Sequence, residues 1–166
     1  AADGVIGHGL FTGEWWREVV RPGYAEGRAA ADRGEAGPCR EIGWVITAVD
    51  DDDPDRAVLD ARRMIAFYLT VKTYDPFVEH HGWTRPVQVL REAFADRDTD
   101  RMAAAVTDEM LEAIAIVGTT AQARAMLQAR GDGLPGDTAF LAPPSYLVGR
   151  RRQAAYARSS LALVQA

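Results

Sequence analysis

The sequence contains a single cysteine, Cys39, among its 166 residues. An internal disulfide is therefore excluded, and the few cysteine and histidine residues do not have the spacing of a zinc site. A long uninterrupted apolar run is also missing, which argues against a membrane-spanning segment. We accordingly expect no metal site and, by default, a cytoplasmic location.

An excess of positive charge is missing as well. The chain has 19 Lys and Arg against 24 Asp and Glu, a formal net charge of -5. Proteins that bind nucleic acid or anionic membranes in general need a net basic surface, so we expect neither partner. The first residues, AADG, include no starting Met, basic stretch or apolar stretch, so we expect no signal peptide and interpret this start as a processed or cut end.

Familiar catalytic patterns are also missing. The sequence has no Ser/His/Asp arrangement, glycine-rich phosphate loop or spaced carboxylate pair, so hydrolase chemistry has no support. The aspartates at 50–53 lack the alternating spacing of a calcium loop and are typical of a helix cap. His80 and His81 are adjacent, and neighbouring residues on a helix diverge by about 100°, so we favour structural roles for both.

The remaining composition is that of a globular protein with one core, with 48% hydrophobic and 26% charged residues. Three short apolar runs bounded by turn signals predict strands near residues 2–8, 40–49 and 138–142. The middle run is apolar on both alternating faces from Ile42 onward, as expected for a central parallel strand covered on both sides.

Helical patterns fill the intervals between these strands. After Thr12, a candidate N-cap, an apolar face predicts a helix that Pro22 should kink or divide, with face residues Trp16, Val20, Tyr24, Gly27 and Ala31. Asp50 to Asp53 followed by Pro54 predicts the start of a second helix. Residues 73–107 are predicted to be an insertion of short helical pieces, with burial expected for Phe77, Trp83, Leu90 and Phe94.

The last third of the chain continues the alternation. We expect a helix over 108–116, a helix capped by Thr119 or Thr120 that ends at Gly131, and a final helix whose apolar face holds Ala154, Ala157, Leu161 and Val164. This order of strands and helices predicts an α/β fold with a parallel sheet. Because a complete (β/α)8 barrel takes about 250 residues, the chain is predicted to form part of one.

Several segments carry a resemblance to a known family. They are ADGVIGH at 2–8, PGYAEG at 22–27, AFY at 66–68, EHHGW at 79–83, and DEMLEA at 108–113 leading into Val117-Gly118-Thr119. In this order and spacing, they resemble the C-terminal half of bacterial luciferase-like oxidoreductases that use flavin or deazaflavin, including the methylenetetrahydromethanopterin reductase branch. The resemblance runs nearly from end to end and treats residues 1–166 as one C-terminal part of such a domain.

The resemblance implies a (β/α)8 barrel in which this chain supplies roughly the last three β/α units, with an insertion at 73–107. It further implies hydride transfer to or from a small organic substrate with the coenzyme F420, or alternatively FMN. The family's N-terminal strands hold most of the coenzyme pocket, so we expect the chain alone to be inactive and its partner to be that missing half or another copy of itself. The alternatives are a shortened, noncatalytic relative that acts as a structural or binding module, and an unrelated small α/β ligand-binding protein.

Candidate ligand-contacting residues lie where strands end, because barrels bind ligands at that face. Gly7 and His8 end the first predicted strand and Thr12 begins the next helix, although a loop histidine and a simple N-cap are the competing interpretations. Pro143 and Ser145 follow the last strand. The arginines at 150–152 start a helix, where a cation opposes the helix dipole; Arg150 is a candidate for binding a phosphate, while a solvated or interface turn is the favoured interpretation.

Three strands taken from a barrel leave two edges and one apolar face open. We therefore expect this face to be covered by another copy or by the missing half, through Val5, Ile6, Trp44, Ile46, Phe140 or Leu141.

Overall fold

The computed structural model describes residues 3–31 and 38–165. Four strands are present in this part of the chain: β1 (Gly4–Gly7), β2 (Arg40–Val49), β3 (Ile116–Gly118) and β4 (Thr138–Ala142). Residue 2, which the expected first strand included, lies outside the described residues. The helical elements are α1 (Gly13–Trp15), η1 (Trp16–Val20), α2 (Arg21–Ala30), α3 (Pro54–Leu69), η2 (Lys72–Tyr74), α4 (Asp75–His80), α5 (Thr84–Ala95), α6 (Thr99–Ala105), α7 (Asp108–Ile114), α8 (Thr120–Arg130), η3 (Gly131–Gly133) and α9 (Arg150–Val164).

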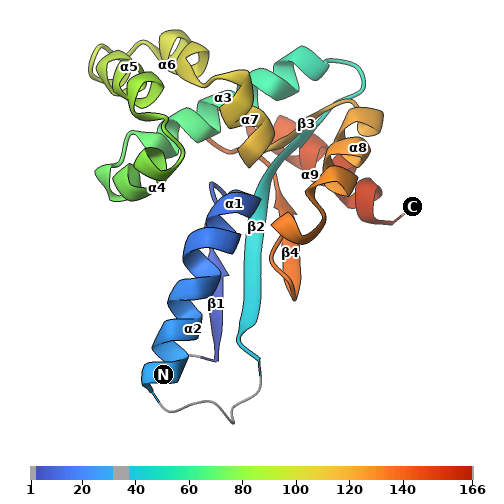
Figure 1. The fold of residues 1–166 in the computed structure, drawn as a ribbon. Coiled ribbons are helices and arrows are strands. Elements are labelled where there is room, and N and C mark those ends of the chain that lie inside the picture. The colour runs from blue at the N-terminus through green and yellow to red at the C-terminus, as the bar shows by residue number, and fades with distance from the viewer. Residues whose placement is uncertain (1–2, 32–37, 166) are drawn as a thin grey trace.

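The four strands form one parallel sheet around β2. Near its start β2 pairs with β1, with Ile42 opposite Ile6; along its middle it pairs with β4, with Trp44 opposite Phe140; and its last residues pair with β3. The sheet is open, and helices surround its upper part (Figure 1). The predicted α/β fold with a partial barrel is confirmed.

One strand was missed by the sequence interpretation. The helix expected over 108–116 ends at Ile114, and Ile116 to Gly118 form β3 against the end of β2. Three buried apolar residues are too few to show a strand period, so periodicity could not separate them from the preceding helix.

The two faces of β2 enter different environments. Val45 and Val49 belong to a small core with Ile116 of β3 and Ala123 of α8. Ile46 and Ala48 point to the other face and belong to the larger core, which includes residues of α3, the insertion and α7. Nearer the strand starts, a side chain at Gly7 would collide with Trp16 of η1 and one at Gly43 would collide with Pro135, so both positions need glycine.

The lower half of the second face is not covered by this chain. Ile6 is 74% exposed and Phe140 is 50% exposed, and their strand partners Ile42 and Trp44 are only half-buried. The expected interface set needs correction. Ile46 is fully buried within the chain, and Val5 and Leu141 lie on the opposite face, because side chains alternate along a strand.

Helix boundaries follow the predicted local signals. The segment after Thr12 changes from the π-helical η1 to α2 at Arg21 and Pro22, the predicted place, but the helical backbone continues without a break. Proline lacks an amide donor, and a wider turn accommodates the lost hydrogen bond. Asp53 caps α3 through the amide of Arg56, as the acidic run predicted. Thr119 and Gln122 form a reciprocal capping box for α8, which ends at Gly131 with a positive φ of 45°.

Two burial predictions were wrong. Within the helical insertion Phe77, Trp83 and Leu90 are buried as expected, but Phe94 is 47% exposed near the end of α5. On α9 the buried residues are Tyr156 and Ser160, whereas Leu161 and Val164 are exposed. The reason is that α9 lies against β2 and β4 by its other face; the predicted apolar face lines a groove of about 290 Å³ beside Phe140.

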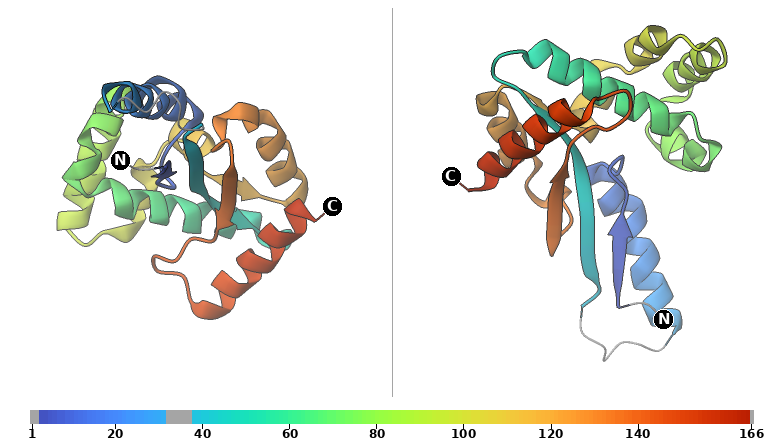
Figure 2. Two further views of the ribbon diagram at one scale, coloured as in Figure 1. Left: turned by 90° about the horizontal axis from the view of Figure 1, so that it is seen from below. Right: turned by 180° about the vertical axis from the view of Figure 1, so that it is seen from behind.

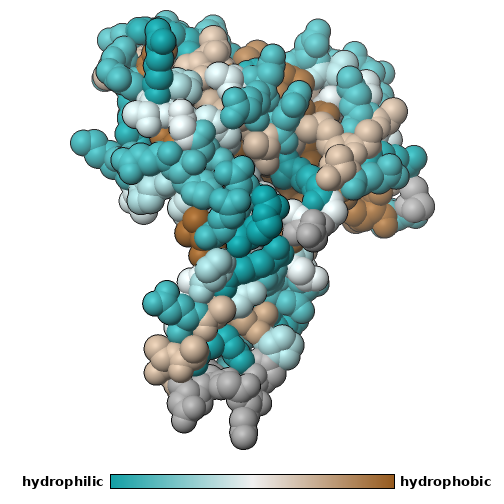
Figure 3. All heavy atoms as spheres, in the orientation of Figure 1, coloured by the Kyte–Doolittle hydropathy of each residue, from teal (hydrophilic) through white to brown (hydrophobic). Residues whose placement is uncertain are grey.

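The molecule consists of a broad helical head and a narrow stem formed by β1, α2 and the first half of β2 (Figures 1 and 2). In the space-filling view, hydrophobic residues reach the surface where stem and head meet and near the end of α9, between largely hydrophilic regions (Figure 3). None of the helices in the described part of the chain is long and apolar enough to cross a membrane.

Candidate functional site

His8 stands directly after β1, at the end of the sheet where parallel strands finish. Its ring is half-buried and packs edge-on against Trp44 of β2 and Tyr68 of α3, with centroid separations of 4.9 and 4.5 Å. Tyr74 of η2 approaches the same ring at 5.3 Å. The strand end, the central strand and the start of the insertion therefore meet at one imidazole.

The surroundings of His8 fix its protonation state. Burial lowers its pKa, so the ring is neutral near pH 7. The amide of Leu10 donates to Nδ1 at 3.2 Å, which places the single ring proton on Nε2. Among the described residues no hydrogen bond involves this Nε2, so the group is available as a donor to a bound ligand.

Tyr68 and Tyr74 complete the polar part of this aromatic group. Burial is the main cause that raises the pKa of each phenol, so both keep their protons at neutral pH. The arrangement therefore offers neutral donors beside apolar rings. It suits a flat, partly polar ring system better than a charged group.

Gly7 and Thr12, the other predicted site residues of this segment, serve the loop itself. Gly7 is buried against Trp16. Thr12 is 3% exposed, and its hydroxyl accepts from the Trp15 amide at 3.0 Å, which confirms the N-cap interpretation. The same oxygen lies 3.0 Å from Nε2 of His81, a contact between α1 and the insertion that the sequence did not predict.

The loop after β4 approaches the same region through α3. Ser145 is exposed and its hydroxyl lies 3.8 Å from the sulfur of Met64, while Tyr68 contacts His8 one turn further along α3. Tyr146 of this loop stacks on Phe67 at 4.3 Å. Ser145 and His8 thus both contact α3, at Met64 and at Tyr68, and Pro143 is half-buried in the same loop.

The three arginines at the start of α9 differ in their contacts. Arg152 lies 3.8 Å from Asp60 and 3.9 Å from Asp50, and its pKa is raised chiefly by its hydrogen bond with Tyr156. Arg150 is exposed in the first turn and has no ion pair within the described residues. Within the described residues, the guanidinium of Arg152 is therefore paired with carboxylates, whereas that of Arg150 is not.

Asp60 is the centre of a buried cluster that the sequence interpretation missed. The carboxylate is fully buried, accepts a hydrogen bond from the Tyr156 hydroxyl at 3.0 Å, and pairs with Arg56 at 3.0 Å. Acidic and basic residues at (i, i+4) give only a weak signal on a helix, and Tyr156 is distant in sequence. The cluster joins α3 to α9 and engages the Asp60 carboxylate in structural contacts.

The structure also differs from the expectation for His80 and His81. Both imidazoles approach the carboxylate of Glu14, which reaches the end of α4 from α1. The divergence of adjacent helical residues, on which the structural interpretation was based, does not prevent both rings from contacting one group of a distant segment.

Comparison with known proteins places this geometry in a family. The family model described as luciferase-like monooxygenase matches residues 1–138. Uncharacterized proteins of Mycobacterium bovis and Mycobacterium tuberculosis are 30% identical over 135 residues, which cover 80% of this chain and 39% of those proteins.

A solved structure shows a similar fold. The coenzyme F420 dependent tetrahydromethanopterin reductase from Methanopyrus kandleri superposes with a TM-score of 0.66 at 21% identity, over 95% of this chain and 43% of that chain. The chain thus spans less than half the length of the proteins it matches. Because the family model matches more than half of the chain, the chain belongs to the luciferase-like monooxygenase family.

Proposed function

We propose that this chain supplies the C-terminal part of the barrel of a luciferase-like oxidoreductase that transfers a hydride between coenzyme F420 and a small organic substrate. The observation that carries the proposal is the neutral His8 imidazole at a strand end, with Nε2–H available and aromatic rings on several sides. The family and the F420 dependence of the similar reductase support the same class of coenzyme. FMN is the alternative, because its ring has a similar shape.

The residues present fit such a coenzyme. A deazaflavin or flavin ring is flat, has apolar faces and carries carbonyl oxygens at one edge. Trp44 and the exposed Phe140 line the open face of the sheet below His8, and the ring proton of His8 can be donated to a carbonyl oxygen. When bound, the coenzyme supplies the carbon that accepts or donates the hydride.

The roles of the remaining candidates follow from their placement. We assign Arg150 to the phosphate that both coenzymes carry, because its guanidinium is exposed at the first turn of α9. Pro143 and Ser145 would line the mouth between Arg150 and His8. Gly7 and Thr12 act by shaping the loop that holds His8 rather than by contacting the coenzyme.

The test is a titration of the intact protein, expressed from the full reading frame that contains these residues, with F420 followed by its fluorescence. His8→Phe keeps a flat ring but removes the donor, so we expect about tenfold weaker binding. His8→Gln retains a donor and should recover much of the affinity. Glu26→Gln, an exposed change on α2, is the matched control and should bind as the parent does.

Two outcomes would decide against the proposal. Unchanged affinity in His8→Phe would remove His8 from the site. Failure of the intact protein to bind either F420 or FMN would favour the alternative, a noncatalytic relative that acts as a structural or binding module. The uncovered sheet face is the observation that favours this alternative.

We expect no turnover from the 166-residue chain alone, and we propose a cytoplasmic location for the protein.

A further inference from the structure

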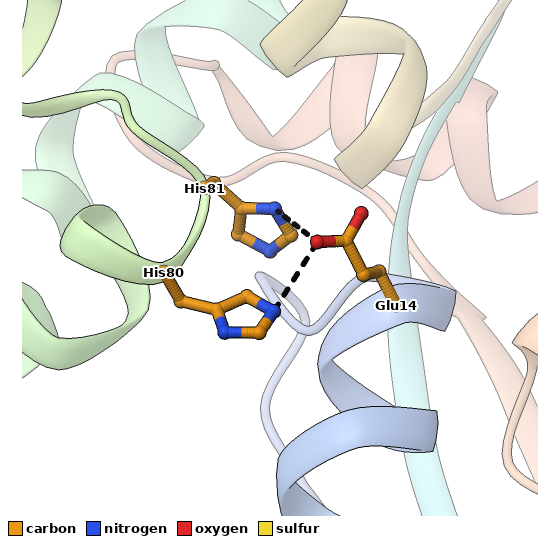
Figure 4. Close-up of side chains that lie close together, drawn as sticks. All are labelled: Glu14, His80 and His81. Carbon is orange, nitrogen blue, oxygen red and sulfur yellow. Dashed lines mark ion pairs between the residues drawn. The ribbon is translucent and has the colours of Figure 1, made fainter.

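A group of nitrogen and oxygen atoms lies between α1 and the end of α4, apart from the proposed coenzyme contacts. Glu14, His80 and His81 each offer one ligand atom, and these atoms all lie within 4.8 Å of one another. The two imidazoles approach the Glu14 carboxylate from the same side (Figure 4). The group joins segments more than sixty residues apart in the sequence.

The distances match those of a small metal coordination sphere. Oε1 of Glu14 is 3.2 Å from Nε2 of His80 and 3.8 Å from Nδ1 of His81. Ligand atoms on a tetrahedral zinc with bonds of about 2.0–2.1 Å are separated by about 3.3 Å. Two of the three separations are therefore close to the required spacing, and all three lie within 4.8 Å.

In each imidazole, the nitrogen that lies near Glu14 is available to bind a metal ion. The Nε2 of His81 lies 3.0 Å from the Thr12 hydroxyl oxygen, and a proton on Nε2 directed at this oxygen leaves the lone pair of Nδ1 facing Glu14. Such an outer partner that holds the ring of a ligating histidine is a regular feature of metal sites. The Nε2 of His80 is buried and makes no hydrogen bond within the described residues.

The surrounding charge favours a cation. Oε2 of Glu18 lies 3.6 Å from the same Nε2 of His80, and Glu109, which bonds the indole of Trp83, faces His81 as a further negative charge.

We propose that Glu14, His80 and His81 bind one divalent first-row transition metal ion, with zinc as the reference ion, and that this ion clamps α1 to the helical insertion. Two imidazoles and one carboxylate form a ligand set that zinc accepts, and a water molecule or Glu18 can complete the coordination. The clamp would hold the loop from His8 to Thr12 against α4. The inference does not depend on the proposed coenzyme.

Chelator-treated protein should be titrated with Zn²⁺ by calorimetry, in a Cys39→Ser background so that the free thiol does not contribute. We expect one ion per chain and a rise in Tm of about 5 °C or more at saturating Zn²⁺. Glu14→Gln and His80→Gln should each weaken binding at least tenfold. Glu79→Gln removes the same charge from an exposed position of α4 and should bind as the parent does.

A second readout does not require tight binding. The indole of Trp15 lies 5.2 Å from His80, so Cu²⁺ at the site should quench tryptophan fluorescence in the parent and in Glu79→Gln but not in His80→Gln. Equal Tm values for the metal-free parent and the metal-free variants show that the substitutions act on metal binding and not on folding. We expect this equality for Glu14→Gln because Glu14 is exposed. Absence of Zn²⁺ binding, or binding that is equal in Glu14→Gln and His80→Gln, would overturn the proposal.

Discussion

Glu41 shows how one buried carboxylate can fasten the stem of the molecule. Arg21 donates to both of its oxygens at 2.9 Å, the Tyr24 hydroxyl donates at 2.7 Å, and the Gly136 amide donates at 3.0 Å. The Arg21 guanidinium is the largest of the contributions that lower the pKa of Glu41 to about 2. This group connects α2, which has no buried residue, to β2 and to the segment before β4.

Replacing this carboxylate should destabilise the protein in a pH-dependent manner. A folded pKa of about 2 against an ordinary value of 4.5 means that the ionised Glu41 stabilises the fold fully above pH 4.5 and that this stabilisation is lost as the pH falls toward 2. Glu41→Gln should lower the free energy of unfolding at pH 7 by about 2 kcal/mol, after allowance for solvent screening of the partly exposed Arg21.

Urea denaturation at pH 7 and at pH 3 measures this difference. The difference in the free energy of unfolding between the parent and Glu41→Gln should be smaller at pH 3 than at pH 7. The exposed change Glu26→Gln should alter the free energy of unfolding little at either pH. A larger difference for Glu41→Gln at pH 3 would show that another group provides the stabilisation.

Residue-level signals explain which parts of the site could be foreseen. His8 was identifiable because a strand end in a β/α alternation marks the ligand-binding face. The partners of Glu41 and Asp60, and the approach of His80 and His81 to Glu14, join segments far apart in the chain. No local pattern encodes such contacts.

At the scale of elements, local chemistry determined most boundaries. Asp53 with Pro54, and Thr119 with Gln122, place two helix starts through capping hydrogen bonds that the sequence displays directly. The three-residue β3 and the exposed side of α9 were predicted wrongly, because the former is too short to show a period and the latter depends on which face meets the sheet. Propensity identifies an amphipathic face but not its partner.

The contact between β1 and η1 provides a test at this scale. A Cβ at Gly7 would lie inside van der Waals contact with the ring of Trp16, which is itself buried. Gly7→Ala should therefore lower the free energy of unfolding by about 2 kcal/mol through overpacking. Gly23→Ala, in the exposed part of α2 with open space around it, should instead leave stability unchanged or raise it by up to about 1 kcal/mol.

Thermal or urea unfolding of the two variants gives the comparison. Equal stability of Gly7→Ala and the parent would mean that η1 does not pack on β1 as described.

At the scale of the whole molecule, the sheet is an incomplete surface. Ile6, Phe140 and the half-buried Ile42 and Trp44 form an open apolar face, and a groove runs beside β4 along the exposed side of α9. In a closed barrel both strand edges would be paired and this face would be filled by side chains. The match to only 39–43% of the length of related proteins agrees with that geometry. The missing part of the coenzyme pocket is proposed to lie on the strands that would complete the barrel.

Sedimentation equilibrium of the purified chain tests this account most directly. An apolar face and two free strand edges should drive association, so we predict a species heavier than the 18.1 kDa monomer at micromolar concentration. The double variant Ile6→Lys, Phe140→Lys should shift the distribution toward the monomer with little loss of helix content, because both side chains are exposed within the chain. A monodisperse 18.1 kDa monomer across the concentration range would contradict the account of an incomplete barrel and favour an independent small α/β domain.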